Sequence, residues 1–139
     1  MSQFVLDASV ALAWVLDNPA PVYALEVRQE LLRGMRGLVP ALWHLEIANG
    51  LAMAERRRDL SAADVEDALE QIQATAASKV DTHLDLVPLR EALENARAFQ
   101  LTAYDAVYLE LARREGLALA TLDKGLRAAA VKAAVALMK

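Results

Sequence analysis

The chain has 139 residues, of which 56% are hydrophobic and 24% charged, with a mean hydropathy of +0.22. At this length, so much apolar surface supports one folded domain over residues 1–139 and excludes a disordered chain. There is no cysteine and there are two histidines, which excludes disulfide bonds, thiolate catalysis and cysteine-ligated metal sites. The formal net charge is −4, so bulk charge does not indicate nucleic-acid binding.

Neither a membrane span nor a secretory signal is visible in the sequence. The longest apolar run covers residues 10–16, far short of the roughly 20 residues that a membrane span needs. The N-terminal residues contain no basic segment, and Asp7 interrupts the first apolar stretch. We therefore expect a cytoplasmic protein that does not associate with membranes.

Short apolar runs alternate with helical patterns along the whole chain. In chain order we expect a strand at residues 3–6, a helix at 8–16, a helix from the Pro19/Pro21 pair to about 32, a strand at 37–39, a helix from Pro40 to the arginine cluster at 56–58, a helix after the Ser61–Asp64 capping box, a loose strand at 79–84, a helix from Pro88, a helix from 102 to 116, a strand at 117–120, a helix at 124–132 and an edge strand within 133–138.

This alternation predicts an α/β fold with a small, mostly parallel central sheet wrapped by helices, an α/β/α sandwich. In such sheets the functional crevice lies beyond the carboxyl ends of the strands. Asp7 and Asp123 each end a predicted strand. Parallel neighbouring strands would place both side chains at the same edge of the sheet.

Two further acids interrupt faces of helices that are otherwise apolar. Glu46 lies well inside its predicted helix, and Asp105 shares a face with Tyr108 and Leu109. A buried carboxylate costs several kcal/mol unless it is paired or coordinated. The purely structural alternative is that Asp7 and Asp123 are helix N-caps and that Asp105 closes a capping box, each contributing about 1 kcal/mol. Glu46 has no such explanation.

Four acids converging without matching lysines or arginines favour a cation site. Ligation by carboxylate oxygens alone selects hard ions, Mg²⁺ or Mn²⁺, over zinc or copper. Such ions act on phosphates, and metal-bound water serves as the nucleophile, so no serine or cysteine is required. The sequence indeed contains no P-loop and no G-x-S-x-G motif.

Four segments together resemble the PIN-domain ribonucleases, and most of all the VapC toxins of type II toxin–antitoxin systems. They are Asp7-Ala8-Ser9, Glu46 with Asn49, residues 101–106 (LTAYDA) and residues 120–124 (ATLDK). The resemblance implies a PIN-like fold, an Mg²⁺- or Mn²⁺-dependent endoribonuclease activity, inhibition by a VapB-type antitoxin, and a homodimer. It also implies that Asp7, Glu46, Asp105 and Asp123 are the catalytic, metal-binding acids, and that Ser9, Asn49 and Thr121 orient carboxylates or waters.

The proposed ligands account for the whole formal charge of −4, so an acidic chain remains compatible with an RNA substrate once divalent cations are bound. Candidate contacts to the RNA backbone are Lys124, Arg127 and the Arg56–Arg58 cluster, which could equally be solvated helix ends. Gly125 departs from the family pattern, because many relatives carry a bulkier, often basic residue at this position. The glycine would weaken RNA contact there.

Other interpretations remain open at this point. A phosphatase with an aspartyl nucleophile would use Asp7, but it usually needs a second aspartate where Ser9 stands. A PIN nuclease of general RNA processing and a non-catalytic protein-binding module are further alternatives. We expect His44 and His83 to be structural or on the surface, and Trp14 and Trp43 to be in the core or at an interface. Trp14, with Val22 and Leu25, could supply a dimer interface or an antitoxin groove. Gly50, inside its helix, indicates either close helix packing or crowding at the metal site.

Overall fold

The computed structural model describes residues 2–139, which form a four-stranded parallel sheet with seven helices. The strands are β1 (Gln3–Leu6), β2 (Arg36–Pro40), β3 (Val80–His83) and β4 (Leu119–Ala120), in the spatial order β3-β2-β1-β4. The helices are α1 (Ala8–Leu16), α2 (Val22–Leu32), α3 (Leu42–Arg56), α4 (Ala62–Lys79), α5 (Leu89–Phe99), α6 (Ala103–Glu115) and α7 (Lys124–Lys132). The predicted α/β fold with a small parallel sheet is thereby confirmed.

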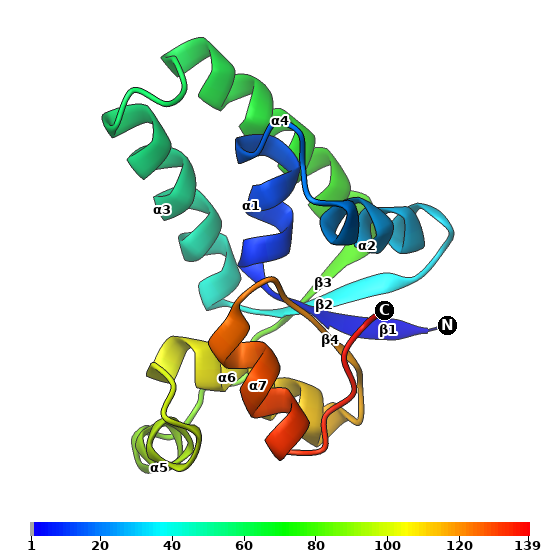
Figure 1. The fold of residues 1–139 in the computed structure, drawn as a ribbon, viewed down its shortest axis with the longest axis vertical. Helices are drawn as coiled ribbons and strands as arrows, with labels where there is room; N and C mark the ends of the chain where they lie inside the picture. The colour runs from blue at the N-terminus through cyan, green and yellow to red at the C-terminus, as the bar shows by residue number, and fades with distance from the viewer. Residues whose placement is uncertain (1) are drawn as a thin grey trace.

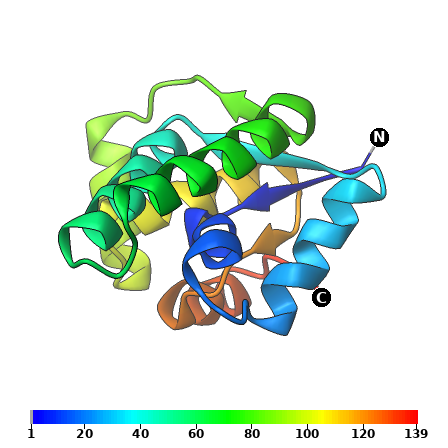
Figure 2. The ribbon, with the colours of Figure 1, turned by 90° about the horizontal axis from the view of Figure 1, so that it is seen from above.

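The sheet separates two groups of helices. Helices α1 to α4 lie on one side, where the hairpin of α3 and α4 projects away from the strands, and α5 to α7 lie on the other side (Figure 1). Viewed from above, α1 lies between α4 and α2 (Figure 2). Because both faces of the sheet are covered, the inner strand β1 is apolar after its first residue, and Phe4, Val5 and Leu6 are completely buried.

Parallel pairing brings the carboxyl ends of β1 and its neighbour β4 together. Val5 pairs with Leu119 and Leu6 with Ala120, and the amide of Asp7 donates to the carbonyl of Ala120 at 2.9 Å. The residues that follow β1 and β4 therefore begin at the same edge of the sheet. This is the edge where ligands bind in open α/β folds.

Three predicted boundaries differ from the structure. Pro40 ends β2, where it pairs with His83, so α3 starts at Leu42 and not at the proline. Helix α2 starts at Val22, with Pro21 as its N-cap residue. The expected edge strand after α7 forms only one parallel bridge, between Leu119 and Leu137.

Within residues 2–139, no helix combines the length and the apolar character that a membrane crossing requires.

Candidate active site

The four acids predicted from the sequence line one open pocket of about 280 Å³ at the carboxyl edge of the sheet. Asp7 follows β1, Asp123 follows β4, Glu46 lies in α3, and Asp105 lies in the first turn of α6. The remaining side chains and backbone of the wall come from α1 and α3, and they are those of Ala8, Ser9, Leu12, Asn49 and Gly50. Acids that are far apart in the sequence therefore meet at one place in the fold.

Asp7 is the buried member of this group, with 4% of its surface exposed. Its Oδ2 accepts hydrogen bonds from Ser9 Oγ at 2.6 Å and from Thr121 Oγ1 at 2.7 Å. Although Asp7 is the N-cap residue of α1, its side chain makes no capping hydrogen bond, so the capping explanation of this residue is wrong. Burial raises the pKa of Asp7, as does the nearby charge of Asp123, while the two hydroxyl donors oppose this rise.

The hydroxyls that hold Asp7 also tie the two strand ends together. Ser9 Oγ accepts from the amide of Leu122 at 3.0 Å, and Thr121 Oγ1 accepts from the amide of Asp123 at 3.0 Å. Thr121 is completely buried. Ser9 and Thr121 therefore fix the Asp7 carboxylate and the loop that carries Asp123 as one unit.

For Asp123 the capping prediction holds, because its Oδ2 accepts from the amide of Leu126 at 2.8 Å at the start of α7. For Asp105 it holds only in part. The hydroxyl of Thr102 accepts from the amide of Asp105 at 3.1 Å. The reciprocal hydrogen bond, from the Thr102 amide to the Asp105 carboxylate, is missing, so the box is incomplete, in contrast to the complete capping box of Ser61 and Asp64. Burial raises the pKa of Asp105, and the charges of Asp123 and Asp7 raise it further.

Glu46 is half-buried, and its Oε1 accepts a hydrogen bond from the phenol of Tyr108 at 2.5 Å. Burial raises the pKa of Glu46, as do the charges of Asp7 and Asp105, while the Tyr108 hydrogen bond opposes the rise. Sequence reasoning missed the role of Tyr108. The signal was its position one helical turn after Asp105 on an apolar face, because a buried phenol nearly always has a hydrogen-bond partner.

The pocket is electrostatically unbalanced. Across residues 2–139 none of the four acids takes part in a salt bridge, and no lysine or arginine lines the pocket. As placed, however, no three histidine, cysteine, aspartate or glutamate side chains in this part of the chain are close enough together to hold a metal ion. The donor set, carboxylates supported by hydroxyls and an amide, has the hard-oxygen chemistry that suits Mg²⁺ or Mn²⁺.

Two glycines next to the site leave little room for a Cβ atom. A Cβ on Gly50 would lie 2.7 Å from both methyl carbons of Leu12. Close packing of α3 on α1 therefore explains why a glycine stands at this position. A Cβ on Gly125 would lie 3.3 Å from Oδ2 of Asp123. A bulkier residue at 125 would therefore press on an acid of the pocket.

Of the predicted RNA contacts, Arg127 is used within the protein. Its guanidinium donates to the carbonyl of Thr121 at 2.8 Å and lies 4.9 Å from the ring centre of Tyr23. The guanidinium therefore supports the loop after β4, and its contact with an RNA backbone stays a prediction. Lys124 is exposed beside Asp123, and the Arg56–Arg58 cluster lies at the opposite end of α3 from the pocket.

The comparisons with known proteins agree with this fold. The PIN domain family model matches residues 4–132. The chain is 39% identical over 119 residues to the VapC ribonuclease Mb0985 of Mycobacterium bovis and to ribonuclease VapC9 of Mycobacterium tuberculosis, covering 86% of this chain and 84% of each relative. The crystal structure of PAE2754 from Pyrobaculum aerophilum superposes with a TM-score of 0.67 at 26% identity, covering 92% of this chain and 86% of that one.

The fold and the acid-lined pocket define a chain of the PIN-domain class, and the family match covers nearly its whole length. This chain belongs to the PIN-domain family, within which it is similar to the VapC ribonucleases.

Proposed function

We propose that the protein is a divalent-metal-dependent endoribonuclease and the toxin of a VapBC-type toxin–antitoxin system. The observation that carries this proposal is the convergence of Asp7, Glu46, Asp105 and Asp123, from four separate elements, on one pocket without a basic counterion. Membership of the PIN-domain family and the similarity to relatives named VapC ribonucleases support the reaction class. We place the protein in the cytoplasm, where its RNA substrate is found.

Mg²⁺, or Mn²⁺ in its place, fits the chemistry of these donors. Asp7, Glu46 and Asp123 are each held by a protein donor through one oxygen, Oδ2, Oε1 and Oδ2 respectively. The negative charges of Asp7, Asp105 and Asp123 act on neighbouring acids across the pocket, so a bound cation would relieve their repulsion. When bound, the metal supplies the positive charge that attracts a phosphodiester and activates water for hydrolysis.

The chain's own residues then have distinct tasks. The four acids would hold the cation, Ser9 and Thr121 fix the Asp7 carboxylate, and Asn49 offers a polar group on the pocket wall. The pocket is open, so an extended RNA backbone has access to it. No residue of the site needs to act as a covalent nucleophile.

Asp7→Asn tests the proposal. Asparagine keeps an oxygen that can accept from Ser9 and Thr121 but removes the negative charge. We expect RNA cleavage in Mg²⁺ or Mn²⁺ to be lost, with cut ends mapped on total RNA and EDTA as the metal-free control. Stability in EDTA should stay unchanged or rise, because repulsion within the pocket falls. The matched control is Asp64→Asn, at an exposed capping box, which should cleave like the wild type.

The non-catalytic alternative predicts the opposite result. A protein-binding module would lose nothing from Asp7→Asn, and a variant that cleaves RNA at the wild-type rate would remove Asp7 from the mechanism. A phosphatase would instead trap a phosphoryl group on Asp7. Mass spectrometry of the intact chain after exposure to a phosphomonoester distinguishes that case.

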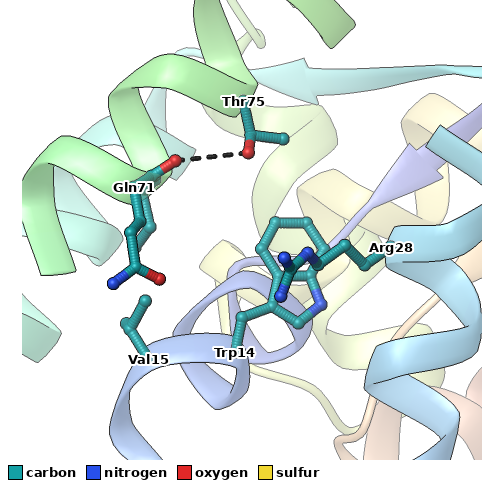
Figure 3. A pocket seen from close by; sticks show the side chains of 6 residues that line it. Trp14, Val15, Arg28, Gln71 and Thr75 are labelled. Carbon is teal, nitrogen blue, oxygen red and sulfur yellow. Dashed lines mark hydrogen bonds between the residues drawn. The ribbon is translucent and has the colours of Figure 1, made fainter. Parts of the chain in front are cut away.

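We further propose that the VapB-type antitoxin binds in the groove between α1, α2 and α4. A cavity of about 140 Å³ there is lined by Trp14, Val15, Arg28, Gln71, Ile72 and Thr75. Figure 3 shows Trp14 of α1 beside Arg28 of α2, with Gln71 and Thr75 on α4. Nearby, Val22 is 71% exposed on α2, which is a large exposure for an apolar side chain. A peptide with apolar anchors and an acidic residue for Arg28 fits this surface.

A homodimer is the remaining part of the proposal. Several large apolar side chains outside this groove are exposed on the opposite side of the sheet, and they are Leu84, Leu86, Leu89, Leu93 and Tyr104. Burying such a surface between two copies would remove it from water. Light scattering during size-exclusion chromatography measures the mass directly, and a mass of about 15.1 kDa would rule the dimer out.

A further inference from the structure

Tyr108 joins the two helix layers at the proposed active site. It lies in α6, on one side of the sheet, and its phenol donates to Glu46 of α3, on the other side, at 2.5 Å (Figure 1). Tyr108 has no exposed surface, whereas Glu46 is half-buried and lines the pocket. The hydrogen bond therefore runs from the core to the pocket wall.

The surroundings make this phenol an obligatory donor. Burial raises the pKa of Tyr108 far above its ordinary value, and the adjacent Glu46 carboxylate raises it further. The geometry agrees, because a buried phenol 2.5 Å from a carboxylate oxygen takes the donor role in the hydrogen bond. A phenylalanine would pack equally well at this position, so the hydroxyl itself calls for an explanation.

Glu46 needs such a donor because its other neighbours repel it. Asp7 and Asp105 both place negative charge close to its carboxylate. Glutamate has a long, rotatable side chain, and a half-buried glutamate that is repelled by its neighbours would otherwise turn toward water. The short bond from Tyr108 opposes that rotation.

We infer that Tyr108 is a positioning residue, whose hydroxyl holds the Glu46 carboxylate in the pocket through Oε1 and leaves Oε2 for a divalent cation. This inference rests on the proposed function, because it assigns Glu46 a role in holding the metal. Tyr108 does not line the pocket, so it acts through Glu46 and not on the RNA.

The test is Tyr108→Phe, which removes one oxygen atom. Mn²⁺ binding is measured by electron paramagnetic resonance of free Mn²⁺, and we expect affinity to fall about 10- to 100-fold, as is typical when a partner of a metal ligand is removed. The Mn²⁺ concentration for half-maximal RNA cleavage should rise by the same factor, while the rate at saturating Mn²⁺ stays closer to that of the wild type. A merely structural role would not raise the metal requirement in this way.

Tyr23→Phe is the matched control. It removes the same atom from a tyrosine whose hydroxyl donates to the carbonyl of Met138 at 2.9 Å, away from the pocket. We expect wild-type Mn²⁺ affinity from this variant. An equal loss in both variants, or wild-type affinity in Tyr108→Phe, overturns the inference.

Glu46→Ala supplies a coupling test. In that background Tyr108→Phe should cause no further loss of Mn²⁺ affinity, because its effect passes through Glu46. A further loss would show that Tyr108 acts by another route and would overturn the inference. If the wild-type chain itself binds no Mn²⁺, the proposed function fails. If the wild-type chain binds Mn²⁺ and Tyr108→Phe binds it equally well, only the positioning role of Tyr108 fails, so the two failures are distinguished.

A measurement on the wild-type chain avoids any dependence on the folding of a variant. The chain has three tyrosines, so ¹³C labelling at tyrosine Cζ gives few resonances. Titration with Mg²⁺ should shift the Tyr108 resonance as Glu46 is drawn to the cation, and should leave that of Tyr23 in place. An unchanged Tyr108 resonance, in a chain that binds Mn²⁺, overturns the inference.

Discussion

Replacing Thr121 by valine tests whether the hydroxyl network around Asp7 supports a charge. Valine keeps the shape of threonine but removes the hydroxyl that donates to Asp7 Oδ2 at 2.7 Å and accepts from the amide of Asp123 at 3.0 Å. Thr121 is completely buried, so water cannot replace either bond. The change therefore leaves a buried carboxylate with one hydroxyl donor, Ser9, in place of two.

The magnitude follows from the two bonds. A hydrogen bond to a charged group contributes about 1.5–3 kcal/mol and a neutral one about 1 kcal/mol. Because loss of Thr121 leaves Ser9 in place, we expect the free energy of unfolding to fall by about 2–4 kcal/mol at pH 7.5 in EDTA. For a chain of 139 residues this corresponds to a fall in Tm of roughly 7–14 °C.

The assay is a thermal melt followed by circular dichroism at a series of pH values. The Thr121 hydroxyl lowers the pKa of Asp7, so it stabilises the ionised form more than the protonated form. The destabilisation by valine should therefore be largest where Asp7 is ionised and should shrink as the pH falls through its folded pKa. Thr75→Val is the control, because the Thr75 hydroxyl donates to the Gln71 carbonyl of its own helix α4 and supports no charge, and it should change stability by less than about 0.5 kcal/mol. A destabilisation that is the same at every pH would refute the argument that the hydroxyl serves the Asp7 charge.

Three further predictions follow from the site. The pKa values of Asp7, Glu46 and Asp105 are raised in the folded state, so in EDTA these groups favour folding most below their unfolded pKa values, and this stability is lost as the pH rises through their folded pKa values. The Tm of Asp7→Asn minus the Tm of the wild type should therefore grow from pH 4 to pH 8, and a difference that does not change with pH contradicts this. Saturating Mg²⁺ should make the wild type the more stable of the two. Gly50→Ala gains about 1 kcal/mol of helix propensity but displaces the methyl groups of Leu12 at a cost of about 1–3 kcal/mol. We expect a modest fall in Tm and a larger loss of RNA cleavage. Unchanged cleavage would show that the pocket tolerates the displaced leucine. Arg127→Leu should lower the free energy of unfolding by about 2–3 kcal/mol in a denaturant titration, through the lost bond to the Thr121 carbonyl and the lost ring contact, and a change of less than 0.5 kcal/mol would contradict its structural role.

The fold was predictable where a segment carries its own pattern. β1 and the strand before Asp123 are apolar runs in the sequence, and the Ser61 capping box forms as predicted. β3 gave only a faint signal, because it is an edge strand whose four residues are all half-buried and three of them are polar. The boundary at Pro40 was wrong since pairing with His83, a contact between distant segments, extends β2 to the proline.

The acids of the site were predictable for a local reason, and their partners were not. Each acid either ends a strand or interrupts an apolar helix face, and both features can be seen within a few residues. Tyr108 and its partner Glu46 are 62 residues apart, and Thr121 and Asp7 are 114 apart, so only the fold reveals that they touch. The internal contact of Arg127 was missed for the same reason, because the sequence shows its charge but not the ring of Tyr23 on which it lies.

The sequence left open whether these acids lie at helix N-termini for structural reasons or serve as metal ligands. In this fold the two roles are compatible. Asp7, Asp105 and Asp123 occupy the N-cap or first turn of α1, α6 and α7, so three helix N-termini meet at the pocket. Each N-terminus favours a nearby negative charge by about 0.3–1 kcal/mol. These helix ends stabilise the clustered carboxylates in the absence of a cation, and no lysine or arginine is needed for the purpose. A basic residue would compete with a divalent ion for the same oxygens, whereas a helix dipole leaves them accessible. The same positions can therefore lie at helix N-termini, hold the fold together and present oxygens to the proposed metal.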